Sequence, residues 1–163
     1  MNKLLVSACL LGDPVRYDGQ AKTVKNPLLQ QLIDADRVVG FCPEVEGGLP
    51  IPRPAAEIQG GSGNNVIAGT AQVSTQDGDE VTQYFLAGAE KALALCHRHE
   101  IRVAMLTELS PSCGSTQTYD GSFSRKRING SGVTTALLRK NNIVVFNQYQ
   151  LAEAIDTLDT VNG

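Results

Sequence analysis

Three of the four cysteines of this 163-residue chain follow short apolar runs that predict buried β-strands. Cys9 and Cys42 each come shortly after such a run, and Cys113 follows another after a polar turn. The carboxyl ends of the strands in an open parallel sheet share one edge, and ligands bind there. We therefore expect three thiols from distant parts of the sequence to meet at one site. Thiolates bind soft metals and iron–sulfur clusters, and three of them leave one coordination position open.

Each cysteine also has a simpler interpretation, because a free cysteine is often a small buried hydrophobe. The chain has no Cys-x-x-Cys pair, which argues against a zinc ribbon and a thioredoxin-like motif. Cys96 falls with Leu93 on the apolar stripe of a long predicted helix. We expect Cys96 to pack in the core and to take no part in the site.

Polar residues beside these cysteines are candidates for proton transfer and ligand binding. Glu44 follows Cys42 closely, where a carboxylate can shuttle a proton or simply be a solvated loop acid. Ser110 and Ser112 precede Cys113, and their hydroxyl groups suit contacts with a ligand or with cluster sulfides. Ordinary turn chemistry uses the same residue types, so both interpretations stay open.

A proline-rich segment over residues 47–54 carries Arg53. Proline fixes the backbone angle φ, so this segment is expected to be stiff and extended and to project Arg53 in a defined direction. An arginine held in this way can clamp an anion or a polar heterocycle, and it can equally pin a neighbouring loop.

The elements that must position these residues alternate between strands and helices. Strands are predicted over residues 3–8, 37–41, 102–106 and 143–146, and helices over residues 27–35, 80–99, 132–140 and 148–158. Residues 43–63 and 107–131 predict long irregular loops, and residues 65–68 and 71–75 predict a small hairpin. This alternation favours a single three-layer α/β/α domain over residues 1–158, with a mainly parallel, about four-stranded, Rossmann-like sheet. Residues 159–163 are expected to form a frayed tail.

The composition is that of an ordinary globular protein, with 42% hydrophobic and 19% charged residues. The net charge of -3 argues against long nucleic acids and anionic membranes as main partners, because both call for a cationic surface. No apolar run approaches the roughly 20 residues that span a bilayer, and the first residues predict a strand rather than a signal peptide. We therefore expect a cytoplasmic protein, whose thiols stay reduced.

Several motifs together resemble the thiouracil desulfurase family, a bacterial family long known only as a domain of unknown function. They are SACLLG at residues 7–12, VRYDG at 15–19, CPEVEGGLP at 42–50, PRPAAEI at 52–58, SPSCGS at 110–115, YDGSF at 119–123 and GVTTALLR at 132–139. The resemblance covers nearly the whole chain.

The resemblance implies a [4Fe-4S] cluster held by Cys9, Cys42 and Cys113, with a fourth iron that has no protein ligand. That iron would bind the sulfur of a small thiolated pyrimidine such as 2- or 4-thiouracil. The reaction would be a hydrolysis without net redox change, in which thiouracil and water give uracil and hydrogen sulfide. Such a cluster is expected to be sensitive to oxygen and to be lost during purification in air.

The resemblance also suggests roles for the neighbouring residues. Glu44 is expected to carry protons, with Ser110 assisting. Arg53, Lys22 and Ser112 are expected to bind the substrate. The basic stretch at residues 124–127 departs from the small residues expected there, and it leaves open whether the substrate is a free base or a nucleotide carrying phosphate.

Two alternatives remain at this point. The same cysteines could hold a cluster or a zinc ion in a binding or sensing module that has no turnover. A metal-free thiol enzyme could instead use Cys113 as its nucleophile, although no histidine lies near it in the sequence. The oligomeric state is not indicated by the sequence.

Overall fold

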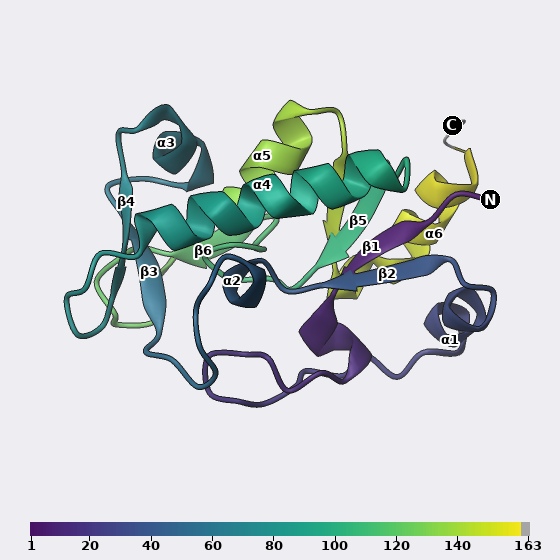
Figure 1. Ribbon diagram of the computed structural model, residues 1–163, viewed down its shortest axis with the longest axis horizontal. Helices are drawn as coiled ribbons and strands as arrows, with labels where there is room; N and C mark the ends of the chain where they lie inside the picture. The colour runs from purple at the N-terminus through teal and green to yellow at the C-terminus, as the bar shows by residue number, and fades with distance from the viewer. Residues whose placement is uncertain (161–163) are drawn as a thin grey trace.

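A four-stranded sheet forms the centre of the computed structural model, which describes residues 1–160 (Figure 1). Its strands are β1 (Leu4–Ser7), β2 (Val38–Phe41), β5 (Val103–Leu106) and β8 (Val144–Asn147). They lie in the order β2-β1-β5-β8, and every neighbouring pair is parallel. The structure thus confirms the α/β fold with a parallel four-stranded sheet.

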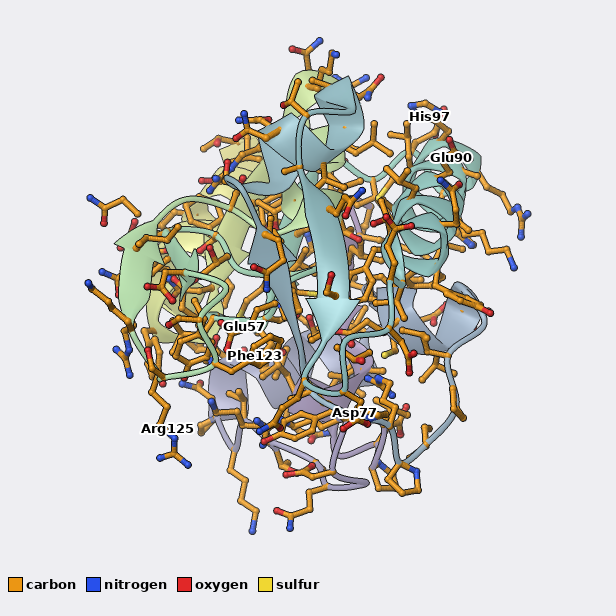
Figure 2. All side chains as sticks on the ribbon, turned by 90° about the vertical axis from the view of Figure 1, so that its left-hand side faces the viewer. Glu57, Asp77, Glu90, His97, Phe123 and Arg125 are labelled. Atoms are coloured by element: carbon orange, nitrogen blue, oxygen red, sulfur yellow. The ribbon has the colours of Figure 1, made fainter. Side chains whose placement is uncertain are left out.

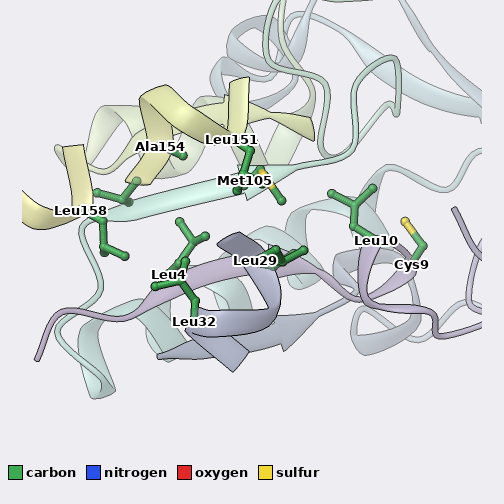
Figure 3. Packing of buried hydrophobic residues seen from close by; sticks show 11 residues of the cluster. Leu4, Cys9, Leu10, Leu29, Leu32, Met105, Leu151, Ala154 and Leu158 are labelled. Atoms are coloured by element: carbon green, nitrogen blue, oxygen red, sulfur yellow. The ribbon is translucent and has the colours of Figure 1, made fainter. Parts of the chain in front are cut away.

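Helices cover both faces of this sheet. Those on one face are α1 (Pro27–Asp34) and α6 (Leu151–Thr160), and those on the other are α4 (Thr82–Arg98) and α5 (Val133–Lys140). Successive strand residues point to opposite faces, so Leu4 packs with α1 and α6, whereas Leu5 packs with Cys96 of α4. Figure 3 shows the first of these cores, in which Leu29 and Leu158 approach Leu4. Cys96 is fully buried in the second core, as expected.

The helix ends follow local signals in the sequence. The side chain of Asn26 caps α1 by accepting a hydrogen bond from the backbone N–H of Leu28 (2.9 Å), and Pro27 occupies the first helical position. The tail predicted from Asp159 begins too early, because α6 continues through Thr160 and Asp159 accepts a hydrogen bond from Arg37 (3.2 Å). The rest of the predicted tail, residues 161–163, lies outside the described residues.

Two segments predicted as irregular loops contain regular elements. Residues 43–63 include α2 (Pro43–Glu46) and β3 (Ala56–Gln59). Residues 107–131 include the antiparallel pair β6 (Gln117–Tyr119) and β7 (Arg127–Asn129).

The hairpin predicted for residues 65–68 and 71–75 is wrong. Residues Gly63–Ala68 form helix α3, because Ser62 and Asn65 satisfy each other's backbone N–H groups in a capping box. Strand β4 (Gln72–Thr75) does form, but its antiparallel partner is β3.

A smaller core lies beside the central sheet and supports these outer strands. Ile58 of β3, Val66 of α3 and Phe85 of α4 pack together there. The 17-residue helix α4 is about 25 Å long. It therefore reaches from this outer core to the central sheet, as Figure 1 shows. Within residues 1–160, none of the helices combines the length and the apolar composition that crossing a bilayer requires.

Helix α2 lies directly against α4 at a point where only glycine fits. A Cβ atom on Gly88 would lie 2.0 Å from the backbone oxygen of Pro43, and one on Gly47 would lie 2.1 Å from that of Tyr84. Lys91 of α4 also donates a hydrogen bond to the carbonyl of Glu46 (2.9 Å). The position of α2 is thus fixed by backbone contact with α4.

We expect Gly88→Ala to lower the free energy of unfolding by about 2 kcal/mol or more, because the added methyl group overpacks the contact between α2 and α4. The melting temperature should fall by roughly 5 °C or more. Glu90→Ala, at an exposed position of the same helix, is the control and should change it little. A Gly88→Ala protein as stable as the wild type would show that α2 can move away at no cost.

Candidate functional site

One cavity of about 420 Å³ opens at the carboxyl edge of β2, β1 and β5, and three cysteines line it. Cys9 lies in a short 3₁₀ helix, η1 (Ala8–Leu11), directly after β1. Cys42 is the N-cap residue of α2, directly after β2, and Cys113 lies in the turn that follows β5. The topology therefore brings together the three thiols singled out in the sequence.

The thiols are free and mostly buried. The Sγ atom of Cys9 lies 2.9 Å from the Thr107 hydroxyl, and the Sγ atom of Cys113 lies 3.5 Å from the Ser112 hydroxyl oxygen. Burial raises the pKa of Cys9 and of Cys42, and it raises that of Cys113 to about 12. Across the described part of the chain, no three His, Cys, Asp or Glu side chains stand close enough to share a single metal ion.

A nearly buried ion pair joins Glu44 to Arg53 beside the thiols. The Nε atom of Arg53 lies 3.2 Å from Oε1 of Glu44, and Arg53 is only 8% exposed. The Nη1 and Nη2 atoms of the same guanidinium group donate to the backbone carbonyls of Pro50 (3.2 Å) and Val15 (3.0 Å), respectively. Arg53 thus holds neighbouring loops and orients a carboxylate, which is the pinning alternative considered for it.

Two serine hydroxyls connect Glu44 to the Cys113 turn. Oε2 of Glu44 accepts a hydrogen bond from Ser112 (3.0 Å) and a longer one from Ser110 (3.5 Å). The Ser110 oxygen also accepts the backbone N–H of Cys113 (3.1 Å). Two hydroxyl groups that can pass protons therefore lie directly beside the carboxylate, 3.0 Å from each other.

All the residues predicted to form the site line this same cavity: Cys9, Cys42, Cys113, Glu44, Ser110, Ser112, Arg53 and Lys22. The sequence analysis missed Thr107, Glu108, Glu57 and Phe123, which also line it. Thr107 and Glu108 directly follow β5, so their place at the carboxyl edge could have identified them. Glu57 and Phe123 belong to motifs already noted. They come into contact only because β3, β6 and β7 form, and these strands lie in segments that were predicted as loops.

Glu108 holds the loop that carries the catalytic candidates. Its carboxylate accepts backbone N–H groups from Leu109 (3.2 Å), Ser115 (2.9 Å) and Thr116 (3.2 Å), and the amide of Asn147 (2.8 Å). Burial alone would raise the pKa of Glu108, but the hydrogen bonds outweigh it, chiefly those from Thr116, and lower the pKa to about 2. The Glu108 carboxylate thereby holds together the two ends of the segment from Glu108 to Ser115.

Comparisons with known proteins match nearly the whole chain. The model of the 2-thiouracil desulfurase family matches residues 4–150. A [4Fe-4S]-dependent thiouracil desulfidase, TudS, has a solved structure that superposes with a TM-score of 0.91 at 48% identity, covering 99% of this chain and all of that one. The uncharacterized protein YbbK of Bacillus subtilis (strain 168) is 41% identical over 152 residues, which is 93% of this chain and 99% of the relative.

We expect Glu108→Gln to lower the free energy of unfolding by about 1–2 kcal/mol at pH 7, because charge-assisted hydrogen bonds are lost at a partly exposed site. The folded-state pKa lies below the ordinary value of 4.5. The contribution is therefore complete above pH 4.5 and is lost as the pH falls toward 2. Denaturant unfolding between pH 3 and pH 7 should show the wild-type advantage shrinking at the acid end.

The exposed Glu153→Gln variant provides the control, and its stability should follow that of the wild type at every pH. An advantage over Glu108→Gln that stays constant down to pH 3 would contradict the low pKa of Glu108.

Proposed function

Because this chain belongs to the 2-thiouracil desulfurase family, we propose that it removes sulfur hydrolytically from a thiolated uracil at a [4Fe-4S] cluster held by Cys9, Cys42 and Cys113. The observation that carries this proposal is the meeting of three cysteines, from three adjacent strands, with a carboxylate in one cavity. A binding module or a thiol enzyme would not need this combination.

The donor set suits an iron–sulfur cluster. Cys9, Cys42 and Cys113 would each hold a different iron of the cluster, so the three thiols would not need to share one ion. Burial disfavours the three thiolates in the absence of a cation, and bound irons would supply the compensating positive charge. When bound, the cluster supplies a Lewis-acidic iron that stabilises the departing sulfide. Reduced thiols and such a cluster suit the cytoplasm, where we place the protein.

Glu44 carries the protons in this proposal. One of its oxygens is fixed by Arg53, and the other faces the hydroxyls of Ser110 and Ser112. Glu44 accepts a proton from the attacking water, and the two adjacent serine hydroxyls pass protons to and from the carboxylate. The carbon–sulfur bond breaks, a carbon–oxygen bond forms, and the sulfur leaves as hydrogen sulfide with no net change of oxidation state.

The substrate is a small thiolated pyrimidine, taken as a free base or as a nucleotide. Lys22 and Arg16 line the cavity and are not tied to the Glu44 carboxylate. These cations suit the oxygens of the ring or of an attached phosphate. Arg53 is assigned to orienting Glu44 rather than to direct contact with the substrate.

We expect Cys9→Ala, Cys42→Ala and Cys113→Ala each to abolish the cluster and sulfide release. Protein purified without oxygen should be analysed for iron, for acid-labile sulfide and for a broad absorption band near roughly 400 nm. Cys96→Ala is the matched control, because Cys96 is buried in the core away from the cavity, and it should keep iron and activity. Loss of iron in Cys96→Ala alone would overturn the ligand assignment.

We expect Glu44→Gln to retain the cluster but to lower kcat for sulfide release by 100-fold or more, because general acid–base catalysis is worth about 10²–10⁴-fold. Iron content and the visible spectrum should match those of the wild type. Sulfide release from 2- and 4-thiouracil, as bases and as 5′-monophosphates, is the measurement. Undiminished release by Glu44→Gln would remove this carboxylate from the mechanism.

A further inference from the structure

We propose that Phe123 is the stacking surface for the pyrimidine ring and that Glu57 is the residue that positions it. This inference rests on the proposed function and names how the same cavity selects a flat heteroaromatic substrate. Figure 2 shows Phe123 and Glu57 beside one another, with the side chain of Arg125 extending away from the molecule. Both Phe123 and Glu57 line the cavity that holds the three cysteines.

Phe123 is carried by the loop between β6 and β7, and this loop is fixed to strand β3. Oε1 of Glu57 accepts the backbone N–H groups of Gly121 (2.9 Å) and Phe123 (3.2 Å). The amide of Gln59, on the same strand, donates to the carbonyl of Gly121 (2.7 Å). The neck of the loop is closed by a hydrogen bond from the N–H of Asp120 to the carbonyl of Lys126 (2.9 Å). The loop is therefore held by a hydrogen bond between its two ends and by contacts with β3 along one edge.

The backbone at Phe123 is held in a conformation that phenylalanine disfavours. Its φ is +57°, in the left-handed region, and Arg125 two residues later has a φ of +63°. Such residues persist only where their surroundings over-determine them, and they concentrate at ligand sites. Gly121 shows how closely the turn is pressed onto β3, because a Cβ atom there would lie 2.7 Å from the carbonyl oxygen of Ile58.

The anchor is a carboxylate with little access to water. Glu57 is only 8% exposed, and the two backbone N–H groups are the partners that satisfy Oε1. The Glu57 carboxylate holds two backbone N–H groups of a strained turn. It thereby fixes the direction in which the Phe123 side chain leaves the backbone. At this turn that side chain is an aromatic ring, partly buried, at the wall of the substrate cavity.

An aromatic ring at this place matches the chemistry of the substrate. The thiols and Glu44 occupy the carboxyl edge of the central sheet, whereas Phe123 comes from the outer strands. A pyrimidine with its sulfur toward the thiols leaves its ring face available to a wall further out. Aromatic rings stack on bases regardless of the substituents at the base edge. Phe123 thus favours a thione that is part of a planar ring over an aliphatic thiol or thioamide.

The test is steady-state kinetics of sulfide release from 2-thiouracil by cluster-loaded protein with matched iron content. We expect Phe123→Leu to raise KM about tenfold, as for the loss of one base–aromatic stack, and to leave kcat within about twofold. Both residues have the same branching at Cβ, so the strain of the turn is unchanged. Phe123→Tyr should restore the wild-type KM.

Glu57 should act through Phe123 and not independently. We expect Glu57→Ala to raise KM as Phe123→Leu does, and the double variant to be no worse than either single variant. Glu57→Gln keeps an oxygen acceptor for both amides and should preserve the wild-type KM. If the increases in KM caused by Glu57→Ala and Phe123→Leu multiply in the double variant, the positioning role is overturned. An independent structural defect would raise KM further after the ring is lost.

A second measurement reports binding without turnover, because the chain contains no tryptophan. Phe123→Trp places a single indole at the proposed stacking position, and 2-thiouracil should quench its emission within the mixing time of a stopped-flow experiment. Tyr149→Trp is the control, since Tyr149 is 77% exposed and does not line the cavity. This measurement also stays informative if Glu57→Ala fails to fold.

The two proposals fail in different ways. Wild-type protein that holds its cluster but releases no sulfide would overturn the proposed function, and quenching of Phe123→Trp would then still support the stacking position. Sulfide release by the wild type, together with an unchanged KM in Phe123→Leu and equal emission of Phe123→Trp with and without 2-thiouracil, would overturn the role of Phe123 alone.

Discussion

The ion pair between Glu44 and Arg53 connects segments of the cavity wall that are distant in the sequence. Arg53 reaches the Val15 loop and the Pro50 carbonyl, while Glu44 reaches across to the Ser112 hydroxyl. A buried ion pair adds little net stability against an apolar substitute, but loss of one partner leaves an unpaired buried charge and is costly. Its main consequence is geometric, because Arg53 fixes one oxygen of Glu44 while the other oxygen faces the Cys113 turn.

The Cys113 turn is fixed independently from its other side. The backbone N–H groups of Val133 and Thr134, at the start of α5, donate to the carbonyls of Pro111 (2.9 Å) and Ser112 (2.8 Å). The closest approach is at Gly132, where a Cβ atom would lie 2.4 Å from the carbonyl carbon of Ser112. Together with the Glu108 carboxylate, these contacts leave the turn little freedom. A relay of serine hydroxyls needs this rigidity, since a hydrogen bond weakens steeply with misalignment.

The parts of the molecule that follow periodic patterns could be predicted from the sequence. Buried strands beside amphipathic helices gave the parallel sheet, and the shared carboxyl edge then brought Cys9, Cys42 and Cys113 to one place. The errors fall where short-range hydrogen bonds decide the structure. The capping pair Ser62 and Asn65 turned a predicted strand into a helix, and β3 found its partner across an intervening helix. Contacts such as those between Glu57 and the Phe123 turn depend on that pairing, so no local pattern reveals them.

The two halves of the cavity place different demands on the fold. The sulfur end needs three ligands at fixed positions, and adjacent parallel strands provide this because their ends are in register along one edge. The ring end needs a flat wall at a set distance from those ligands, and this wall comes from the outer strands. Helix α4 contributes residues to both cores. The distance between the sulfur end and the ring end of the cavity is therefore set by a continuous helix rather than by a flexible linker. The contact of α4 with α2 at Gly88 adds Glu44, the proposed proton carrier, to the same frame.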